Sequence, residues 1–148
     1  MSIVTPARRR GFEYLDDPAV PAMLRERSLR DVVRSNTILG GAHALLVAVR
    51  RVLPASAGAT TLLDVGTGLA DLPHRVARAA ARRGAAVTTI GYDVAESLLR
   101  ADRGRLSHEV CGDALALPFR SGSVDIVACS QLLHHFARGE AVQLVREM

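Results

Sequence analysis

The segment over residues 61–71 constrains the fold of this chain more than any other. An apolar run ends in Asp64, a tight turn with two glycines follows, and Asp71 stands where a helix can begin, so the order is strand, loop, helix. Gly66 and Gly68 have no Cβ, which lets the loop adopt positive φ and approach a ligand closely. Asp71 can accept the first free N–H groups of the helix. Such a unit indicates an open α/β sheet with a nucleotide-type site at the loop.

The pattern after residue 58 alternates between strands and helices. We expect strands over 60–64, 86–92, 107–111 and 123–130, and helices over 72–83, 94–103 and 139–148. This alternation predicts an α/β fold with a doubly wound, mostly parallel sheet, in a domain covering residues 56–148. Right-handed crossovers then place a ligand at the carboxyl ends of the strands.

The first part of the chain has helical periodicity instead, and residues 1–55 are predicted to form an N-terminal helical cap. We expect helices over 20–34 and 36–53, with Asn36 as a cap of the second and Pro54 ending it. Gly40 and Gly41 fall inside that second helix, where each glycine costs about 1 kcal/mol relative to alanine. Two explanations are open: another element approaches closely, or the helix is broken there.

Three acids stand just beyond the carboxyl ends of predicted strands. Asp93 lies where a carboxylate can accept two hydrogen bonds from a ribose diol. The carboxylate of Asp113 and the N–H of Ala114 can meet the edge of an adenine ring. Each acid, Asp64 included, also has a structural reading as a turn or helix-cap residue, but the coincidence of all three with the glycine turn favours a site. For Asp125, which lies within the fourth predicted strand before Ile126 and Val127, a structural role or turn contact is the better interpretation.

Five spaced motifs carry a resemblance to a known family. They are Leu-Leu-Asp-Val-Gly-Thr-Gly (62–68), Gly-Tyr-Asp (91–93), Gly-Asp-Ala-Leu-Ala-Leu-Pro-Phe (112–119), Ser-Val-Asp-Ile-Val (123–127) and Leu-Leu-His-His-Phe (132–136). Together, over residues 60–148, the chain closely resembles the class I S-adenosylmethionine-dependent methyltransferases, in the small-molecule branch with a helical N-terminal cap. Ala70 stands where the family often has a third glycine, and one extra methyl group is a mild departure.

The resemblance implies the Rossmann-like methyltransferase fold, S-adenosyl-L-methionine as the cofactor and a set of contacts for it. Asp93 would bind the ribose hydroxyls, and Asp113 and Ala114 the adenine. The residues that would shape the pocket for the methionine part are Asp64, Gly66 and Gly68, with Ser130 and Gln131 beside the methionine and sulfonium. The implied reaction is methyl transfer to an oxygen, nitrogen or carbon nucleophile of a small molecule.

No residue is assigned as catalytic, because methyl transfer from a sulfonium needs orientation more than a protein nucleophile. His134, His135 and Tyr14 are weak candidates for a general base, and the two adjacent histidines are expected to point to different sides. One alternative is a nicotinamide-dependent Rossmann oxidoreductase, but Asp71 would put a negative charge where the pyrophosphate binds. The other alternative is a non-catalytic binding protein that keeps the fold.

The composition limits which cellular compartment and which kinds of partner we expect for this protein. All 19 basic residues are arginine, the net charge is +4, and the arginines are scattered among acids, so we expect a solvated surface and no nucleic-acid partner. Cys111 and Cys129 lie in apolar strand-like runs without metal-ligand spacing, which indicates small core residues, a reducing compartment and no metal. No apolar run approaches membrane-spanning length and no signal peptide is present, so we expect a cytoplasmic protein without a membrane partner.

The end of the chain carries a last expectation. The family that the chain resembles has a seven-stranded sheet, whereas this sequence stops in the helix after its fourth predicted strand. The sequence therefore predicts a cofactor-binding half with the acceptor-binding half largely absent. The fourth strand should lie at an open edge of the sheet, where unpaired backbone groups favour self-association.

Overall fold

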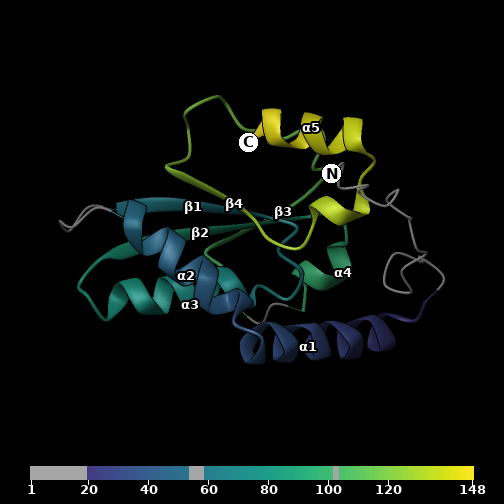
Figure 1. Ribbon diagram of the computed structural model, residues 1–148, viewed down its shortest axis with the longest axis horizontal. Coiled ribbons are helices and arrows are strands. Elements are labelled where there is room, and N and C mark those ends of the chain that lie inside the picture. The colour runs from purple at the N-terminus through teal and green to yellow at the C-terminus, as the bar shows by residue number, and fades with distance from the viewer. Residues whose placement is uncertain (1–19, 54–58, 102–103) are drawn as a thin grey trace, which may run out of the picture.

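A computed structural model describes residues 20–53, 59–101 and 104–148, and its sheet has four parallel strands (Figure 1). The strands are β1 (Ala59–Val65), β2 (Ala86–Asp93), β3 (His108–Cys111) and β4 (Ile126–Cys129), and their order across the sheet is β3-β2-β1-β4. The chain winds outward from β1 to β3 and then returns to place β4 on the other side of β1. The predicted doubly wound α/β sheet is confirmed, with its change of direction at the end of β1.

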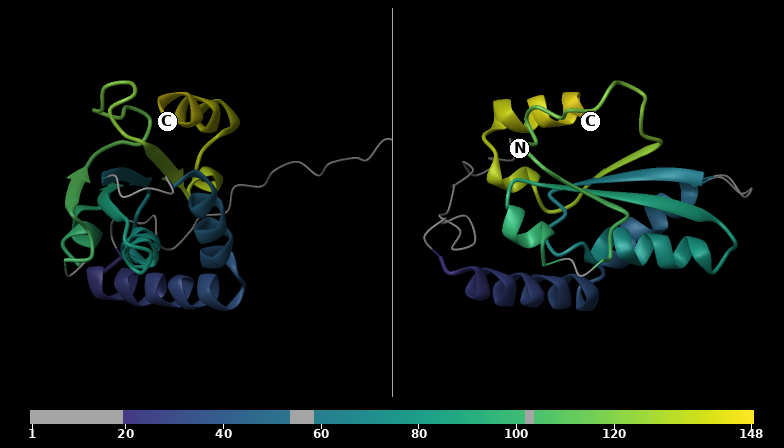
Figure 2. Two further views of the ribbon diagram at one scale, coloured as in Figure 1. Left: turned by 90° about the vertical axis from the view of Figure 1, so that its left-hand side faces the viewer. Right: turned by 180° about the vertical axis from the view of Figure 1, so that it is seen from behind.

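Helices cover both faces of the sheet (Figure 2). One face carries α1 (Ala22–Ile38), α2 (Gly41–Val52), α3 (Asp71–Ala81) and the single turn α4 (Glu96–Leu99). The opposite face carries α5 (Arg138–Glu147). The helices of the connections from β1 to β2 and from β2 to β3 lie on one side and the helix after β4 on the other, as right-handed crossovers require when the winding direction reverses.

The core consists of two apolar layers that share β1. Leu62 packs with Val49 of α2 and Val76 of α3 on one face, and Leu63 packs with Leu144 of α5 on the other. Successive side chains of a strand point to opposite faces, so a central strand must be apolar on both. This explains why the apolar run before Asp64 is continuous rather than alternating.

The two N-terminal helices divide at a different place from the one predicted. The first extends to Ile38, so Asn36 lies inside α1 and does not cap α2, and the predicted cap is wrong. Gly40 has φ +83° and precedes α2, and a Cβ placed on it would meet nothing within 4 Å. Of the two open explanations, the helix break is correct, because the left-handed backbone rather than a close neighbour requires glycine.

Three further elements depart from the expected pattern. The helix expected over 94–103 is only the turn α4 among its described residues. The fourth strand spans Ile126–Cys129 rather than 123–130, and it lies at an edge of the sheet as predicted, so Ile126 is only half-buried. The cap of α3 is Ala70, which makes no side-chain cap hydrogen bond, while Asp71 pairs with Arg75 (Oδ2 to Nε, 2.7 Å), so the predicted capping by Asp71 is wrong.

The proposed division into a cap over 1–55 and a domain over 56–148 stays a prediction, as does self-association through the edge of β4. None of the helices in the described part of the chain is long and apolar enough to span a membrane.

Candidate functional site

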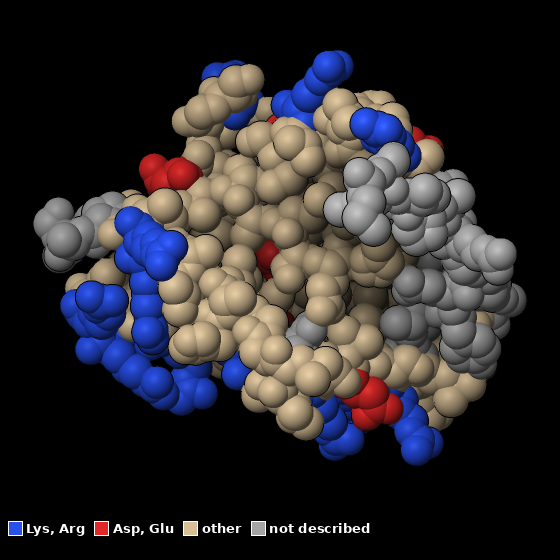
Figure 3. Space-filling view, viewed as in Figure 1, with Lys and Arg blue, Asp and Glu red and all other residues tan. Residues whose placement is uncertain are grey.

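The three predicted acids meet at the carboxyl edge of the sheet. Asp64 is the penultimate residue of β1 and Asp93 is the last residue of the neighbouring strand β2. β3 ends at Cys111, opposite Asp93, so that Asp113 follows on the same edge. The space-filling view has acidic atoms at the bottom of a hollow (Figure 3). Parallel strands bring these acids together because each stands at the same end of its own strand.

Asp93 binds the glycine loop to the end of β2. Its Oδ2 accepts a hydrogen bond from the N–H of Gly68 (2.9 Å), and its Oδ1 accepts one from the N–H of Ala95 (2.9 Å). The structural reading of Asp93 as a turn residue ahead of a helix is therefore part of its role. A carboxylate has about four lone-pair sites, so both oxygens can accept further hydrogen bonds from a ligand.

The loop itself has three left-handed residues within five positions. These are Gly66 (φ +75°), Gly68 (φ +54°) and Ala70 (φ +57°). The N–H groups of Gly66 and Thr67 both donate to the carbonyl oxygen of Tyr92, at 2.8 and 3.2 Å, which fixes the loop against β2. Ala70 is fully buried in the left-handed conformation that suits glycine. For a residue with a Cβ this conformation is less stable by about 1–2 kcal/mol, which explains why the family that the chain resembles often has a third glycine there.

Asp64 is the buried acid of the edge, with 3% of its surface exposed. Burial, together with the negative charge of nearby Asp93, raises the pKa of the Asp64 carboxyl to about 7, and the Thr67 hydroxyl opposes this shift. The Thr67 oxygen Oγ1 is itself buried and has no hydrogen-bond partner of normal geometry among the described residues. Thr67 was not among the predicted site residues, because a threonine between two glycines reads as a loop residue.

The turn after β3 is built on Tyr92. The Tyr92 hydroxyl donates to the carbonyl oxygen of Asp113 (3.1 Å), and a Cβ on Gly112 would lie 2.1 Å from that hydroxyl. Asp113 Oδ1 accepts a hydrogen bond from the N–H of Leu115 (2.9 Å). Its carboxylate therefore stabilises a turn, as the structural interpretation of this residue predicts. The Asp113 side chain remains exposed at the edge, and Ala114 is half-buried beside it.

The segment after β4 corrects the predicted orientation of the two histidines. His134 and His135 lie in a 3₁₀ turn (Leu133–His135) with ring centroids 4.1 Å apart, so they stand side by side and not on different sides. Successive residues of such a turn are about 120° apart rather than opposite. Half-buried Ser130 follows β4 directly, and Gln131 has φ +58°, a left-handed backbone that a non-glycine residue adopts at a price in strain. Tyr14 lies outside the described residues.

The cysteines differ from each other, contrary to the prediction that both lie in the core. Cys111 is exposed because β3 is an edge strand, and Cys129 is half-buried next to the site. Burial, and then the charge of Asp64, raises the pKa of the Cys129 thiol. In the described ranges no three histidine, cysteine or acidic side chains are grouped so that they could hold a metal ion.

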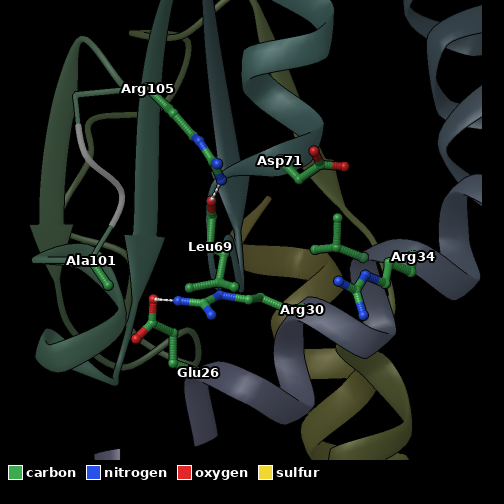
Figure 4. Close-up of a pocket in the computed structure, with 8 residues that line it drawn as sticks. Glu26, Arg30, Arg34, Leu69, Asp71, Ala101 and Arg105 are labelled. Carbon is green, nitrogen blue, oxygen red and sulfur yellow. Dashed lines mark hydrogen bonds and ion pairs between the residues drawn. The ribbon is translucent and has the colours of Figure 1, made fainter. Parts of the chain in front are cut away.

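A cavity of about 210 Å³ separates α1 from the glycine loop (Figure 4). Its lining residues are Glu26, Arg30, Val33, Arg34, Leu69, Asp71, Ala101 and Arg105. Arg105 donates to the carbonyl oxygen of Leu69 (3.0 Å), and Arg75 donates from Nη2 to the Thr37 hydroxyl (2.8 Å), which joins α3 to α1. None of the predicted cofactor residues lines this cavity. The cavity between α1 and the loop is therefore separate from the predicted cofactor residues.

Comparison with known proteins decides the family. A family model described as a methyltransferase domain matches residues 63–148, which contain the glycine loop, all three acids and α5. This chain is a member of the class I S-adenosylmethionine-dependent methyltransferases. The resemblance of the five motifs is thereby confirmed, and the fold agrees with it.

Two curated relatives of this methyltransferase are similar over part of their length. The chain is 38% identical over 101 residues to the biotin biosynthesis bifunctional protein BioHC of Cellvibrio japonicus, covering 65% of this chain and 18% of that protein. It is 33% identical over 86 residues to an uncharacterized methyltransferase of Schizosaccharomyces pombe, covering 57% of this chain and 32% of that one. The chain thus spans less than a third of the length of either curated relative.

Solved structures of methyltransferases share the fold. A putative S-adenosyl-L-methionine-dependent methyltransferase from Methanococcus maripaludis superposes with a TM-score of 0.62 at 13% identity, over 94% of this chain and 61% of that one. A putative methyltransferase of Haloferax volcanii, solved in complex with the Trm112 activator, gives a TM-score of 0.60 at 23% identity, over 87% and 55%. At such identities the likeness supports the fold of this methyltransferase alone.

Proposed function

We propose that this chain binds S-adenosyl-L-methionine at the carboxyl edge of its sheet and transfers the methyl group to a small-molecule acceptor. One observation carries the proposal: the buried Asp64 carboxyl, which has no counter-ion among the described residues, adjoins the glycine loop beside the buried Thr67 hydroxyl, whose oxygen makes no hydrogen bond of normal geometry. A buried polar group is normally paired within the protein. A ligand with positive charge and hydrogen-bonding groups completes this pair, and S-adenosyl-L-methionine fits that description.

The residues that would hold the cofactor follow the order of the edge. Asp93 has acceptor capacity left for the ribose hydroxyls while it holds Gly68 in place. Asp113 and Ala114 lie beyond β3, where the adenine would bind. Toward β1 and β4, the methionine part would contact Asp64, Gly66, Gly68 and Ser130. Held by these residues, the cofactor would lie along the carboxyl ends of the strands, at the switch point of the sheet.

The chemistry asks the protein for position rather than for a nucleophile. The bound cofactor supplies a methyl group that its sulfonium already activates. The loop residues, held by the Tyr92 carbonyl oxygen and the Asp93 carboxylate, fix where that group points. Arg105 donates to the Leu69 carbonyl oxygen within the loop, and Arg75 joins α3, the helix that follows the loop, to α1 through the Thr37 hydroxyl. Orientation of two reactants in a water-poor site is the main source of rate in such a transfer.

The small size of the acceptor is supported by the resemblance to the small-molecule branch and by the name of one relative. The bacterial relative is named for biotin biosynthesis, and biotin is a small molecule. Among solved structures with the same fold, a Thermotoga maritima protein is described as a possible histamine N-methyltransferase, with a TM-score of 0.56. Neither name identifies the acceptor of this chain.

Calorimetric titration of the purified chain tests the proposal. We expect S-adenosyl-L-methionine and S-adenosylhomocysteine to bind at least about tenfold more tightly than NAD or NADP, because Asp71 repels a pyrophosphate beside the loop. Tighter binding of a nicotinamide nucleotide would contradict it. Binding of the cofactor without methyl transfer to any of a panel of small amines, phenols and carboxylates would favour the non-catalytic alternative.

A further inference from the structure

The position of Asp64 makes its charge difficult to maintain in the free protein. It lies in the central strand with 3% of its surface exposed, and β2 and β4 flank it with Gly91 and Ala128, residues that carry no polar side chain. The titratable groups that act on it from the neighbouring strands are the Asp93 carboxyl and the Cys129 thiol, and neither is a cation. Among the described residues, none forms an ion pair with Asp64.

The Thr67 hydroxyl adds a second incomplete group at the same point. Its oxygen is buried and makes no hydrogen bond of normal geometry, so it offsets only part of the effect of burial on Asp64, and a buried carboxylate without a counter-ion destabilises the fold. A carboxyl group escapes this penalty by taking up a proton, and burial raises the pKa of Asp64 accordingly. Below about pH 7 the free site therefore holds a mostly neutral acid, and no cation among the described residues forms an ion pair with its charged form.

We propose that Asp64 is protonated in the free protein and that binding of the cationic cofactor releases this proton to the solvent. The inference rests on the proposed function, since the cation is that of S-adenosyl-L-methionine. The step breaks the O–H bond of the carboxyl group, the electron pair stays on the carboxylate, and the proton passes to buffer. The Asp64 carboxylate would then face the positive charge of the bound cofactor, with the Thr67 hydroxyl beside it.

The direction of the pH dependence follows from this exchange. At low pH the free protein must lose a full proton to bind, so the affinity for S-adenosyl-L-methionine falls as the pH is lowered below about 7. Above that value the carboxylate is already formed and the affinity levels off. S-adenosylhomocysteine lacks the sulfonium charge, so its binding should release a smaller fraction of a proton. Cys129 does not compete, because burial raises the pKa of its thiol.

Calorimetry in buffers of different ionisation enthalpy counts the protons. At about pH 6.5 we expect the unmodified chain to release between half a proton and one proton per S-adenosyl-L-methionine bound, and Asp64→Asn to release almost none. From about pH 8 to about pH 5.5 the Kd of the unmodified chain should rise at least about tenfold, and that of Asp64→Asn less than about threefold. Asp125→Asn, which changes an acid at the other end of the sheet, should behave like the unmodified chain.

The outcomes separate the inference from the function on which it rests. Equal proton release by the unmodified chain and Asp64→Asn overturns the inference while cofactor binding stands. Absence of binding at every pH refutes the proposed function itself. If Asp64→Asn does not fold, which circular dichroism reports, the unmodified chain alone decides, and a heat of binding that does not depend on the buffer overturns the inference. Thr67→Val should weaken binding severalfold and should not reduce the proton release, because it leaves the carboxyl in place and removes the hydroxyl that opposes its raised pKa.

Discussion

Two aspartates at opposite ends of the sheet have opposite environments. Asp64, at the carboxyl end of β1, is buried, has no counter-ion among the described residues, and has a pKa raised to about 7. Asp125, just ahead of β4, is exposed, and its Oδ2 accepts hydrogen bonds from the N–H and the hydroxyl of Thr61, at 2.8 and 2.7 Å. The N–H of Asp125 donates back to the Thr61 hydroxyl (2.9 Å), and these bonds lower the pKa of the Asp125 carboxyl.

The difference shows how a structural acid can be told from a candidate ligand-binding acid. Asp125 has all its partners within the fold and joins the start of β4 to β1, as its structural interpretation predicts. Asp64 has no counter-ion among the described residues, and the Thr67 hydroxyl opposes only part of the effect of burial on its carboxyl. Groups that a fold leaves unpaired at a strand edge lower its stability, and proteins retain such groups where a ligand completes them.

The largest effect that would sharpen this comparison is on stability. In Asp64 the folded pKa, about 7, lies above the ordinary value of 3.8, so its stabilising contribution is present below about pH 3.8 and lost as the pH rises through about 7. Asp64→Asn never carries the charge. At about pH 8 we expect this variant to be about 2–4 kcal/mol more stable than the unmodified chain, and the gap to close toward acid.

Urea unfolding of the cofactor-free protein at several pH values measures this gap. Asp125→Asn is the matched control, with the opposite sign: the lowered pKa of Asp125 stabilises the fold above about pH 3.8, and that contribution is lost as the pH falls. The control should therefore be less stable than the unmodified chain at neutral pH and converge with it in acid. A constant difference between Asp64→Asn and the unmodified chain at all pH values would remove the contrast between the two acids.

The next effect is on ligand affinity. Asp93→Ala should weaken the binding of S-adenosyl-L-methionine by about 1.5–3 kcal/mol, because a charged acceptor is lost from the ribose hydroxyls and the N–H of Gly68 loses its acceptor. Titration calorimetry of Asp93→Ala and Asp125→Ala at one pH measures it. Asp125→Ala should leave the affinity nearly unchanged. Equal weakening by the two substitutions would mean that the assignment of roles to the two ends of the sheet is wrong.

The smallest effect concerns the backbone of the loop. Ala70 is fully buried at φ +57°, a conformation that glycine adopts without strain, and its Cβ is the only group that Ala70→Gly removes. We expect Ala70→Gly to stabilise the fold by about 0.5–1 kcal/mol after the added freedom of the unfolded chain is subtracted. Thermal unfolding measures the change. Gly40→Ala is the inverse control, since it puts a Cβ on a left-handed residue in open space and should destabilise.

Much of the fold was predictable because its signals are local. The apolar run before Asp64, the glycines after it and the spacing of Asp93 and Asp113 depend on short stretches of chain, and parallel pairing alone brings their ends to one edge. The edge position of β4 followed from the expected strand order. One local signal gave a wrong prediction. Aspartate is a residue type that often caps a helix, but Asp71 instead forms an ion pair with Arg75, four residues along the helix.

The sequence by itself determined the order of the helices and strands and the carboxyl edge of the sheet, where the polar groups lie. Both depend on periodicity and turn chemistry, which act between near neighbours in the chain. The tertiary structure decided the state of each group. Whether Asp64 lacks a counter-ion, whether Asp125 is hydrogen-bonded and whether Cys111 is exposed depend on residues far away in the chain: Thr61 binds Asp125 across 64 positions. Burial and electrostatic shifts are sums over such distant neighbours, so they exist only once the chain has packed.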